Sequence, residues 1–319
     1  SRLMRLTDTV DAAFEAHQVP LLRRLVEQPS YSATPEDVEA AQRILDIEAE
    51  ALGLTVERHP GGDFADHRVY RTPGCGPEDP GIALVGHMDT VFPRRLGFLA
   101  FERAGDVARG PGVLDMKSGL TAVLFALRAL KAFDAERFEA LKARFVCVSD
   151  EEIGSTSSAE LYARLAPLCT VGLVFEAGRA EDRVVLARKG SAVFTLTAHG
   201  RAAHAGNHYW QGVNAAHALS LAIPRIEALS EPDGVTANVG LLEAGTARNT
   251  VPDRARCIID VRFTRADQVG PLRAALQAIA DAPSPGRLAA ARLELDGRVS
   301  RPPMEATEAS RALLEAYAR

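Results

Sequence analysis

Residues 82–90 read IALVGHMDT, an apolar run that stops at a polar cluster. The apolar runs at residues 144–148 and 171–175 end in the same way, and residues 117–133 and 157–165 between the runs have helical periodicity. Strands that alternate with helices predict an α/β fold, with a mostly parallel sheet flanked by helices. The polar residues would then gather at the carboxyl ends of the strands, where open α/β sheets place their sites.

The segments before residue 82 fit the same domain. Residues 7–26 have helical periodicity, and residues 34–52 form a second predicted helix with Pro35 in its first turn and Gly53 after its end. Residues 54–57 are a predicted strand. We therefore expect residues 1–180 to form the first part of a catalytic domain.

The pattern changes after residue 180. Predicted strands lie at residues 183–198, 235–242, 254–263 and 292–295, and predicted helices at residues 212–229 and 266–282. The resulting order, βαββαβ, is the ferredoxin-like arrangement, which predicts an inserted α+β domain at residues 181–297. Residues 298–319 contain one more predicted helix, at 306–317, and are expected to return to the catalytic domain.

The composition excludes several classes of protein. The formal charge is −5 without a basic block, so nucleic acid is not an expected partner. No window reaches the roughly 18 apolar residues of a membrane span. The four cysteines form no CxxC pair, which argues against a thiolate zinc site or a disulfide framework. We expect a cytoplasmic protein, or a periplasmic one if a signal peptide was removed before Ser1.

Four short polar clusters carry the chemistry. They read GHMDT at residues 86–90, GPGVLDMK at 110–117, SDEEIGS at 149–155 and FEAG at 175–178. Together they hold one histidine and an excess of carboxylates, whose mutual repulsion is unfavourable unless cations neutralise it. Mixed nitrogen and oxygen ligands suit Zn²⁺, with Co²⁺ or Mn²⁺ as substitutes, and the many carboxylates favour two ions that share a bridging ligand.

Each cluster alone has a simpler interpretation. A single histidine such as His87 is more often structural than a ligand, although Asp89, two residues on, points to the same side and can orient the imidazole. Asp115 is as well placed to be the N-cap of the following helix. Glu151 and Glu152 can be solvated loop charges, or a metal ligand beside a general base.

As a set, and in this order, the four clusters resemble the two-zinc exopeptidase family of glutamate carboxypeptidases, aminoacylases and succinyl-diaminopimelate desuccinylases. Residues 86–93, GHMDTVFP, are most similar to the glutamate carboxypeptidase branch. The resemblance implies that His87 and Glu176 bind one zinc ion, that Asp115 bridges to the second, and that Glu152 binds the second. It also implies that Glu151 is the general base, that Asp89 orients His87, and that a cis peptide bond follows Asp115.

The inserted domain also resembles a part of the family, the lid through which these enzymes dimerise. Residues 200–206, GRAAHAG, resemble the lid motif whose histidine stabilises the tetrahedral intermediate in the partner subunit, which assigns that role to His204. Asn249 and Arg262 match lid residues that hold the free carboxylate of the substrate. The resemblance thus implies a homodimer that acts on small peptides or N-acyl amino acids.

One family ligand is not found. The family places a second zinc-binding histidine near the carboxyl terminus, but no histidine follows His217 here. We therefore expect these 319 residues to be part of a longer protein, with a catalytically impaired form as the alternative.

The function expected from the whole sequence is that of a di-zinc, carboxypeptidase-like amidohydrolase. It would cut an amide bond next to a free carboxylate and release an amino acid such as glutamate. An N-acyl-amino-acid deacylase or a dipeptidase of the same family is the nearest alternative. A dimeric carboxylate-binding protein without activity is the alternative from another class.

Overall fold

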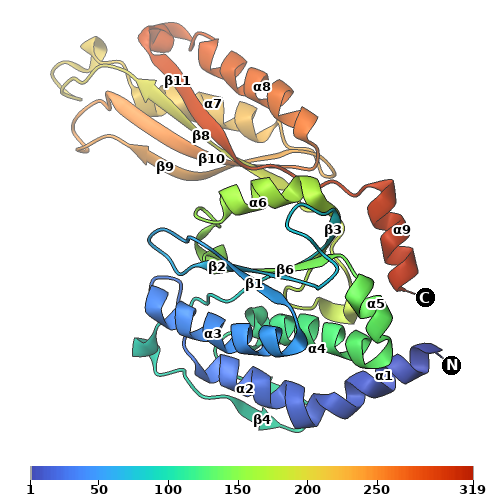
Figure 1. Cartoon of the computed structure of the whole chain (residues 1–319). Coiled ribbons are helices and arrows are strands. Elements are labelled where there is room, and N and C mark those ends of the chain that lie inside the picture. The colour runs from blue at the N-terminus through green and yellow to red at the C-terminus, as the bar shows by residue number, and fades with distance from the viewer. Residues whose placement is uncertain (1, 319) are drawn as a thin grey trace. The chain divides into compact units, whose positions relative to one another are not determined.

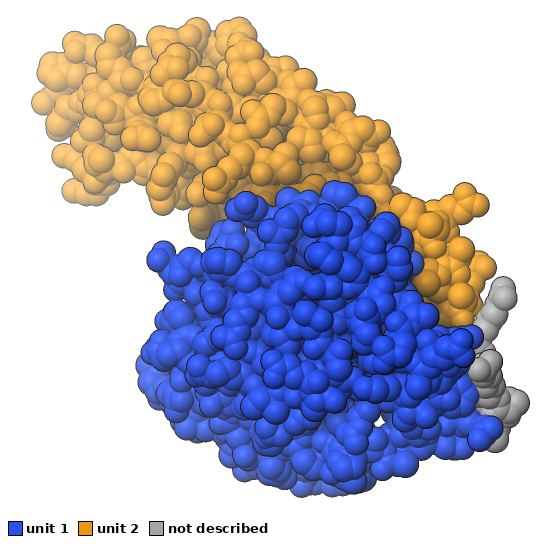
Figure 2. Space-filling view, viewed as in Figure 1, with its two compact units in different colours: residues 1–179 blue, residues 180–319 orange. Residues whose placement is uncertain are grey.

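The computed structural model describes the backbone of residues 2–318 and the side chains of residues 5–318. Ser1 and Arg319, the ends of the predicted first and last segments, lie outside the described residues. The chain divides into two compact units, residues 1–179 and 180–319 (Figure 2). The boundary lies one residue from the predicted end of the first domain. The expected return of residues 298–319 to the catalytic domain stays a prediction.

The first unit is built on a five-stranded sheet with the order β1-β2-β6-β3-β7. Its strands are β1 (Thr55–His59), β2 (His67–Arg71), β3 (Gly81–His87), β6 (Ala143–Val148) and β7 (Cys169–Val174). β3 pairs in parallel with both β6 and β7, whereas β2 pairs antiparallel with β1 and β6. The α/β fold class is confirmed, but the sheet is more mixed than expected because β2 was not predicted.

Helices cover both faces of this sheet (Figure 1). They are α1 (Arg2–Ala13), α2 (Val19–Glu27), α3 (Pro35–Leu52), α4 (Ser118–Phe133), α5 (Ala135–Ala140) and α6 (Ala159–Leu165). Apolar side chains of α3 and α4 pack with Leu84 and Phe145 in the main core, and Leu161 of α6 packs on the opposite face with Val146. A separate two-stranded ribbon contains β4 (Glu102–Ala104) and β5 (Val107–Arg109).

α3 shows why the helix predictions succeed. It begins at Pro35, whose fixed φ suits the first turn, and its C-cap is Gly53 at φ 99°, a left-handed conformation that favours glycine. These local signals do not depend on the rest of the fold.

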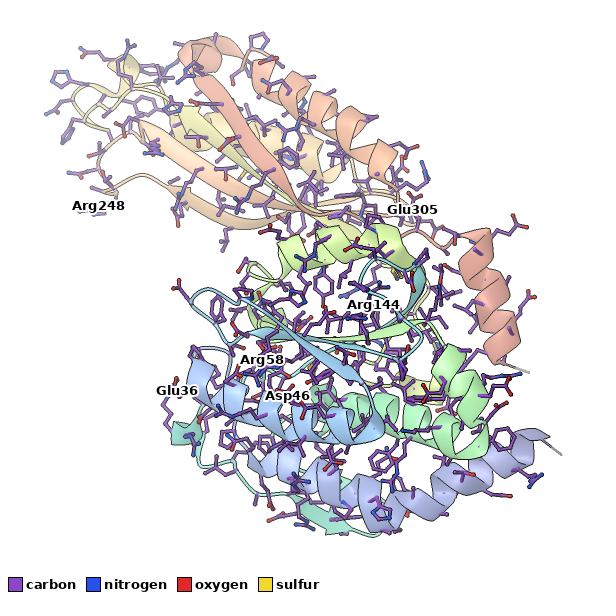
Figure 3. All side chains as sticks on the ribbon, in the orientation of Figure 1. Glu36, Asp46, Arg58, Arg144, Arg248 and Glu305 are labelled. Atoms are coloured by element: carbon purple, nitrogen blue, oxygen red, sulfur yellow. The ribbon has the colours of Figure 1, made fainter. Side chains whose placement is uncertain are left out.

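β2 contributes two side chains to a buried ionic cluster. The Arg68 side chain is fully buried, and its Nε donates to both carboxylate oxygens of Asp46 on α3, at 3.0 and 3.1 Å. Arg68 also forms an ion pair with Glu39, and the Tyr70 hydroxyl donates to Asp46 at 2.9 Å. Asp46 and Arg58, which adds a pair at 3.4 Å, are labelled in Figure 3. This cluster fastens α3 to the sheet beside the strands that carry the site.

The second unit is a four-stranded antiparallel sheet with the order β11-β8-β10-β9. Its elements are β8 (Gly190–His199), α7 (Ala215–Glu227), β9 (Thr236–Ala244), β10 (Arg254–Phe263), α8 (Val269–Asp281) and β11 (Arg292–Arg301). Both helices share one core with the sheet (Figure 1). The expected ferredoxin-like unit is therefore confirmed.

Two details differ from prediction. β8 begins at Gly190, whereas a strand was expected from residue 183; Arg188 makes only an isolated bridge, with Met304. β11 continues to Arg301, past the short strand expected at residues 292–295, because it pairs with β8 along nearly its whole length. A final helix, α9 (Glu308–Tyr317), lies within the predicted range. Among residues 2–318, no helix combines the length and apolar character needed to cross a bilayer.

Candidate functional site

His87 is the centre of a carboxylate cluster in the first unit. It is the last residue of β3, and its side chain is 1% exposed. Its Nε2 lies 3.2 Å from Asp115 Oδ1, 3.5 Å from Glu176 Oε1 and 3.6 Å from Glu151 Oε2. Glu151 and Glu176 follow β6 and β7, the two neighbours of β3 in the sheet. The parallel pairing thus brings together residues that lie up to 89 positions apart, as the strand-end pattern predicts.

The other ring nitrogen fixes the orientation of His87. Nδ1 lies 3.0 Å from the backbone oxygen of Asp89 and 3.3 Å from its carboxylate. Both partners are acceptors, so Nδ1 carries the proton and donates it. Nε2 is therefore the ring nitrogen that faces the carboxylates, and it is the atom through which His87 can bind a metal.

Asp89 connects this histidine to the neighbouring loop. Its buried carboxylate accepts hydrogen bonds from the backbone nitrogens of Glu151 and Glu152, both at 3.1 Å, and from the Ser32 hydroxyl at 2.6 Å. Burial raises the pKa of Asp89, but the hydrogen bonds with His87 and Ser32 outweigh it and hold the pKa below its usual range. Sequence reasoning missed Ser32, which lies 57 residues away in a loop without a motif.

The pKa shifts within the cluster have one common cause, an excess of negative charge in a partly buried place. Burial, followed by the Asp115 carboxylate, raises the pKa of Glu152 to about 7, and burial is also the main cause of the raised pKa of Glu151. Burial alone would lower the pKa of His87, but its bonds with Asp89 and Glu176 raise it to about 11. A proton or a metal ion at Nε2 would each offset the negative charge of the carboxylates, so the two compete for this nitrogen.

The side chains fit the expected metal. His87, Asp115 and Glu176 each offer one ligand atom, and these atoms lie within 4.8 Å of one another; His87, Glu151 and Glu152 form a second such group. The first group contains His87 and Glu176, which are expected to bind one zinc ion, and Asp115, the expected bridging residue; these roles stay a prediction. Imidazole nitrogen with carboxylate oxygens is a suitable donor set for Zn²⁺.

The backbone around Asp115 also matches expectation. The Asp115-Met116 peptide bond is cis, as the family resemblance implies. The N-cap interpretation of Asp115 is not seen: α4 begins at Ser118, and its N-cap position is Lys117. The Lys117 ammonium is buried and donates to the backbone oxygens of Leu25 and Gln28, at 2.6 and 2.9 Å, which ties this segment to the end of α2.

The loop that carries Glu151 is supported from the side by His67. This buried histidine accepts a hydrogen bond from the Ser149 backbone nitrogen at Nδ1, and its Nε2 lies 3.1 Å from the Ser157 hydroxyl. Burial lowers the pKa of His67, although the nearby Asp150 carboxylate acts in the opposite direction.

This lowered pKa predicts a pH effect on stability. As pH falls through about 6.5, the unfolded chain binds a proton at His67 that the folded chain does not bind, so the free energy of unfolding decreases. We expect His67→Gln to show a smaller loss than the wild type between about pH 7 and pH 5 in urea unfolding. His17→Gln, at an exposed position, should keep the wild-type pH dependence. Equal slopes for the wild type and His67→Gln would contradict the assignment.

The predicted lid residues all lie in the second unit. His204 is exposed, and its Nδ1 accepts hydrogen bonds from the backbone nitrogens of Gly206 and Asn207, both at 3.1 Å, so Nε2 carries the proton and can donate. The Asn249 backbone oxygen accepts a bond from Ala205 at 2.9 Å, which places the two motifs side by side. Arg262, on β10, forms an ion pair with Asp260 at 2.8 Å.

Part of the chain matches a known protein family, and the chain is similar in sequence to several curated proteins. Residues 186–287 match the M20 peptidase dimerisation domain. Carboxypeptidase G2 of Pseudomonas sp. strain RS-16 is 31% identical over 254 residues, which cover 77% of this chain and 60% of that protein. The chain spans 56 to 63% of the length of the first curated relatives that it matches.

Two solved structures share the fold. Aminopeptidase PepT from Bacillus cereus superposes with a TM-score of 0.76 at 20% identity, over 94% of this chain and 80% of that one. The YxeP protein of Bacillus subtilis, described as a dinuclear metal-binding peptidase of the M20 family, has a TM-score of 0.65 at 17% identity, over 97% of this chain and 80% of its own. These matches confirm the resemblance drawn from the polar clusters: the chain is similar in sequence to carboxypeptidase G2, and residues 186–287 match the M20 peptidase dimerisation domain.

Proposed function

We propose that this chain carries the metal centre and the lid of an M20 exopeptidase that hydrolyses an amide bond next to a free carboxylate. The observation that carries the proposal is the orientation of His87. Its Nδ1 is fixed by Asp89, while Nε2 faces Asp115 and Glu176, with the Glu151 carboxylate 3.6 Å away. An ordinary structural histidine does not need three carboxylates around one nitrogen.

His87, Asp115, Glu152 and Glu176 are the residues that would hold the metal, two Zn²⁺ ions per subunit or Co²⁺ or Mn²⁺ in their place. The bound ions supply Lewis acidity toward water and the amide carbonyl. The description of YxeP as a dinuclear metal-binding peptidase supports two ions here.

Glu151 is proposed as the general base. Its side chain is 43% exposed, so water and substrate can reach it, and its raised pKa brings it closer to the pH at which it must accept a proton. It takes a proton from the attacking water as the new carbon–oxygen bond forms. It then gives this proton to the amine nitrogen as the carbon–nitrogen bond breaks, so that the reaction is a hydrolysis without an oxidant or reductant.

The lid residues are proposed to act on the substrate. His204, with a proton at Nε2, is suited to donate to the developing oxyanion. Asn249 and Arg262 would hold the free carboxylate. The match to the peptidase dimerisation domain supports a homodimer, in which His204 would serve the partner subunit. Four unpaired cysteines are typical of a reducing compartment and support a cytoplasmic location.

The proposal is tested with the protein expressed from its complete coding sequence and loaded with zinc. N-acyl-glutamates, N-acetyl amino acids and dipeptides are assayed in parallel. Preferential hydrolysis of the first class supports the carboxypeptidase, and preference for the second or third supports the deacylase or dipeptidase. A zinc-loaded protein that hydrolyses none of them is the binding protein of the alternative class.

Metal content gives a test that does not depend on turnover. We expect His87→Ala to lose about one equivalent of zinc per chain after dialysis, because the side chain supplies the nitrogen ligand of the cluster. The measurement is inductively coupled plasma mass spectrometry of the purified protein. His217→Ala, at an exposed position on α7, is the matched control and should retain the wild-type content. Retention of all zinc by His87→Ala would show that the ions bind elsewhere.

A further inference from the structure

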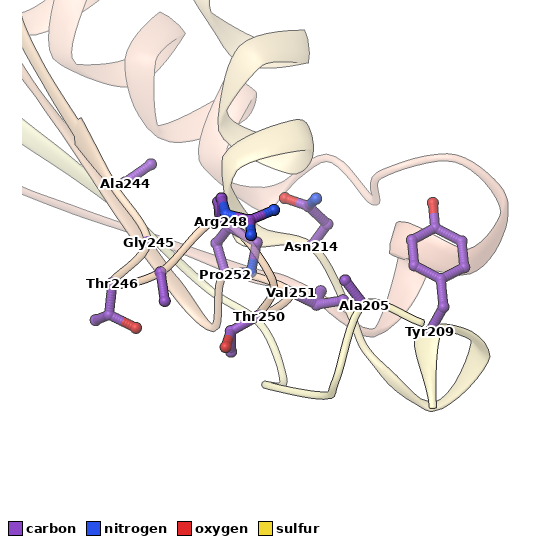
Figure 4. A pocket seen from close by; sticks show the side chains of 11 residues that line it. Ala205, Tyr209, Asn214, Ala244, Gly245, Thr246, Arg248, Thr250, Val251 and Pro252 are labelled. Carbon is purple, nitrogen blue, oxygen red and sulfur yellow. The ribbon is translucent and has the colours of Figure 1, made fainter. Parts of the chain in front are cut away.

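A cavity of about 520 Å³ lies in the second unit, where the loop between β9 and β10 meets the segment before α7 (Figure 4). Its lining includes Thr246, Arg248 and Thr250 from the first loop, and Ala205, Tyr209 and Asn214 from the second segment. A volume of this size is sufficient for a small organic ligand.

The residues that line the cavity carry positive charge only. Arg248 is its single charged residue, and no carboxylate is among the described residues that line it. Two arginines of β10 are engaged in ion pairs: Arg256 pairs with Glu243 and Arg262 with Asp260, both at 2.8 Å. Within residues 5–318, the Arg248 guanidinium has no hydrogen bond or ion pair. Its five donors are thus available to a ligand.

Several polar side chains that line the cavity with Arg248 can donate hydrogen bonds. The side-chain oxygen of Asn214 already accepts a bond from the His217 backbone nitrogen at 2.9 Å, which leaves its amide hydrogens to face outward. The hydroxyls of Thr246, Thr250 and Tyr209 can donate as well. Donors around a cation, without a competing carboxylate, are the arrangement that binds a carboxylate.

The cavity borders both motifs that are proposed to contact the substrate. Ala205, which lines it, follows His204, and Arg248 precedes Asn249 in the chain. The two segments are joined by backbone hydrogen bonds of 2.9 Å, from Ala205 to Asn249 and from Val251 to Ala203. A group in the cavity is therefore held next to the substrate contacts of the same unit.

We propose that Arg248 and this cavity form an anion subsite, separate from Arg262, that receives a second carboxylate of the substrate. Preferred substrates are then amides that carry an acidic group in addition to the carboxylate beside the scissile bond. The inference rests on the proposed hydrolysis. The acidic group can belong to the released amino acid or to the acyl part, and the chemistry that Arg248 recognises is the same in both.

Two substrate pairs distinguish these sources. N-benzoyl-glutamate against N-benzoyl-glutamine tests an acidic group on the amino acid, and N-succinyl-leucine against N-succinamoyl-leucine tests one on the acyl part. We expect Arg248→Gln to lower the acidic-to-neutral ratio of kcat/KM by about 10- to 100-fold in one pair, the range of a hydrogen bond to a charged group. Arg248→Lys should keep part of the preference, because a point charge remains.

The control and a binding measurement make the outcomes decisive. Arg225→Gln removes the same charge from an exposed position on α7 that does not line the cavity, and should keep the wild-type ratio. The glutarate dianion, titrated calorimetrically, should bind at least about 10-fold more weakly to Arg248→Gln than to the wild type.

If ratios and glutarate affinity are the same in Arg248→Gln and the wild type, the subsite is wrong, even where hydrolysis is observed. If the variant changes only the molecular mass in solution, the cavity is a contact between subunits and the proposal is overturned. If no substrate is cut but glutarate binding depends on Arg248, the anion site stands and the proposed hydrolysis fails.

Discussion

Glu151→Gln is expected to lower kcat by about 10²- to 10⁴-fold, the usual contribution of a general base, while the zinc content stays close to that of the wild type. Glutamine has nearly the same shape, but its amide cannot take a proton from water or return one to the leaving amine. The backbone nitrogen of Glu151, which donates to Asp89 at 3.1 Å, is not altered by the substitution. The loss should therefore appear in the chemical step and not in the architecture of the site.

The measurement is steady-state hydrolysis of N-benzoyl-glutamate by the complete protein, with zinc determined on the same samples. Glu136→Gln, at an exposed position in α5, is the matched control and should turn over like the wild type. A Gln variant with more than about a tenth of wild-type kcat would remove Glu151 from the role of general base. A variant that has also lost zinc would indicate that Glu151 is a ligand instead.

Arg68→Met is expected to destabilise the first unit by about 3–5 kcal/mol. The substitution keeps an apolar stem of similar length but removes the charge that faces Asp46, whose side chain is only 6% exposed. Asp46 would retain the Tyr70 hydroxyl at 2.9 Å and Arg58 at 3.4 Å, and the side chain of Arg58 is 56% exposed. A buried carboxylate without its principal partner is more costly than the loss of a surface ion pair.

Urea unfolding followed by circular dichroism gives the free energy for each variant. Arg58→Met, which removes a partner of the same carboxylate from an exposed position, should cost less than about 1 kcal/mol. The double variant Asp46→Leu/Arg68→Met should recover part of the loss, because it removes both buried charges together. An Arg68→Met protein as stable as Arg58→Met would show that the cluster is not a stabilising element.

Much of the fold could be read from local patterns. The helix at Pro35–Leu52 has a proline at its start and a glycine after its end, and the ferredoxin-like unit follows from its order of strands and helices. β2 could not be read in this way. Its residues, HRVYR, look too polar for a central strand, and Arg68 becomes acceptable there only because Asp46 and Glu39 come from a helix more than 20 residues earlier.

The candidate site also contains residues that the sequence predicts and residues that it does not. His87, Glu151, Glu152 and Glu176 lie at strand ends, so an α/β topology alone predicts that they meet. Ser32 and His67 support the site through contacts with Asp89 and with the Ser149 backbone, and nothing in their neighbouring residues signals those contacts. Arg248 was not recognised either, because an unpaired arginine in a loop becomes notable only when the surrounding cavity is known.

Asp89 has a broader consequence for this centre. One carboxylate sets the tautomer of His87 and holds the backbone of Glu151 and Glu152, and these contacts are made by protein groups alone. The histidine on β3 and the loop after β6 therefore depend on the same group. A substitution at Asp89 would disturb both together, so neither half of the centre can be altered through this residue without the other.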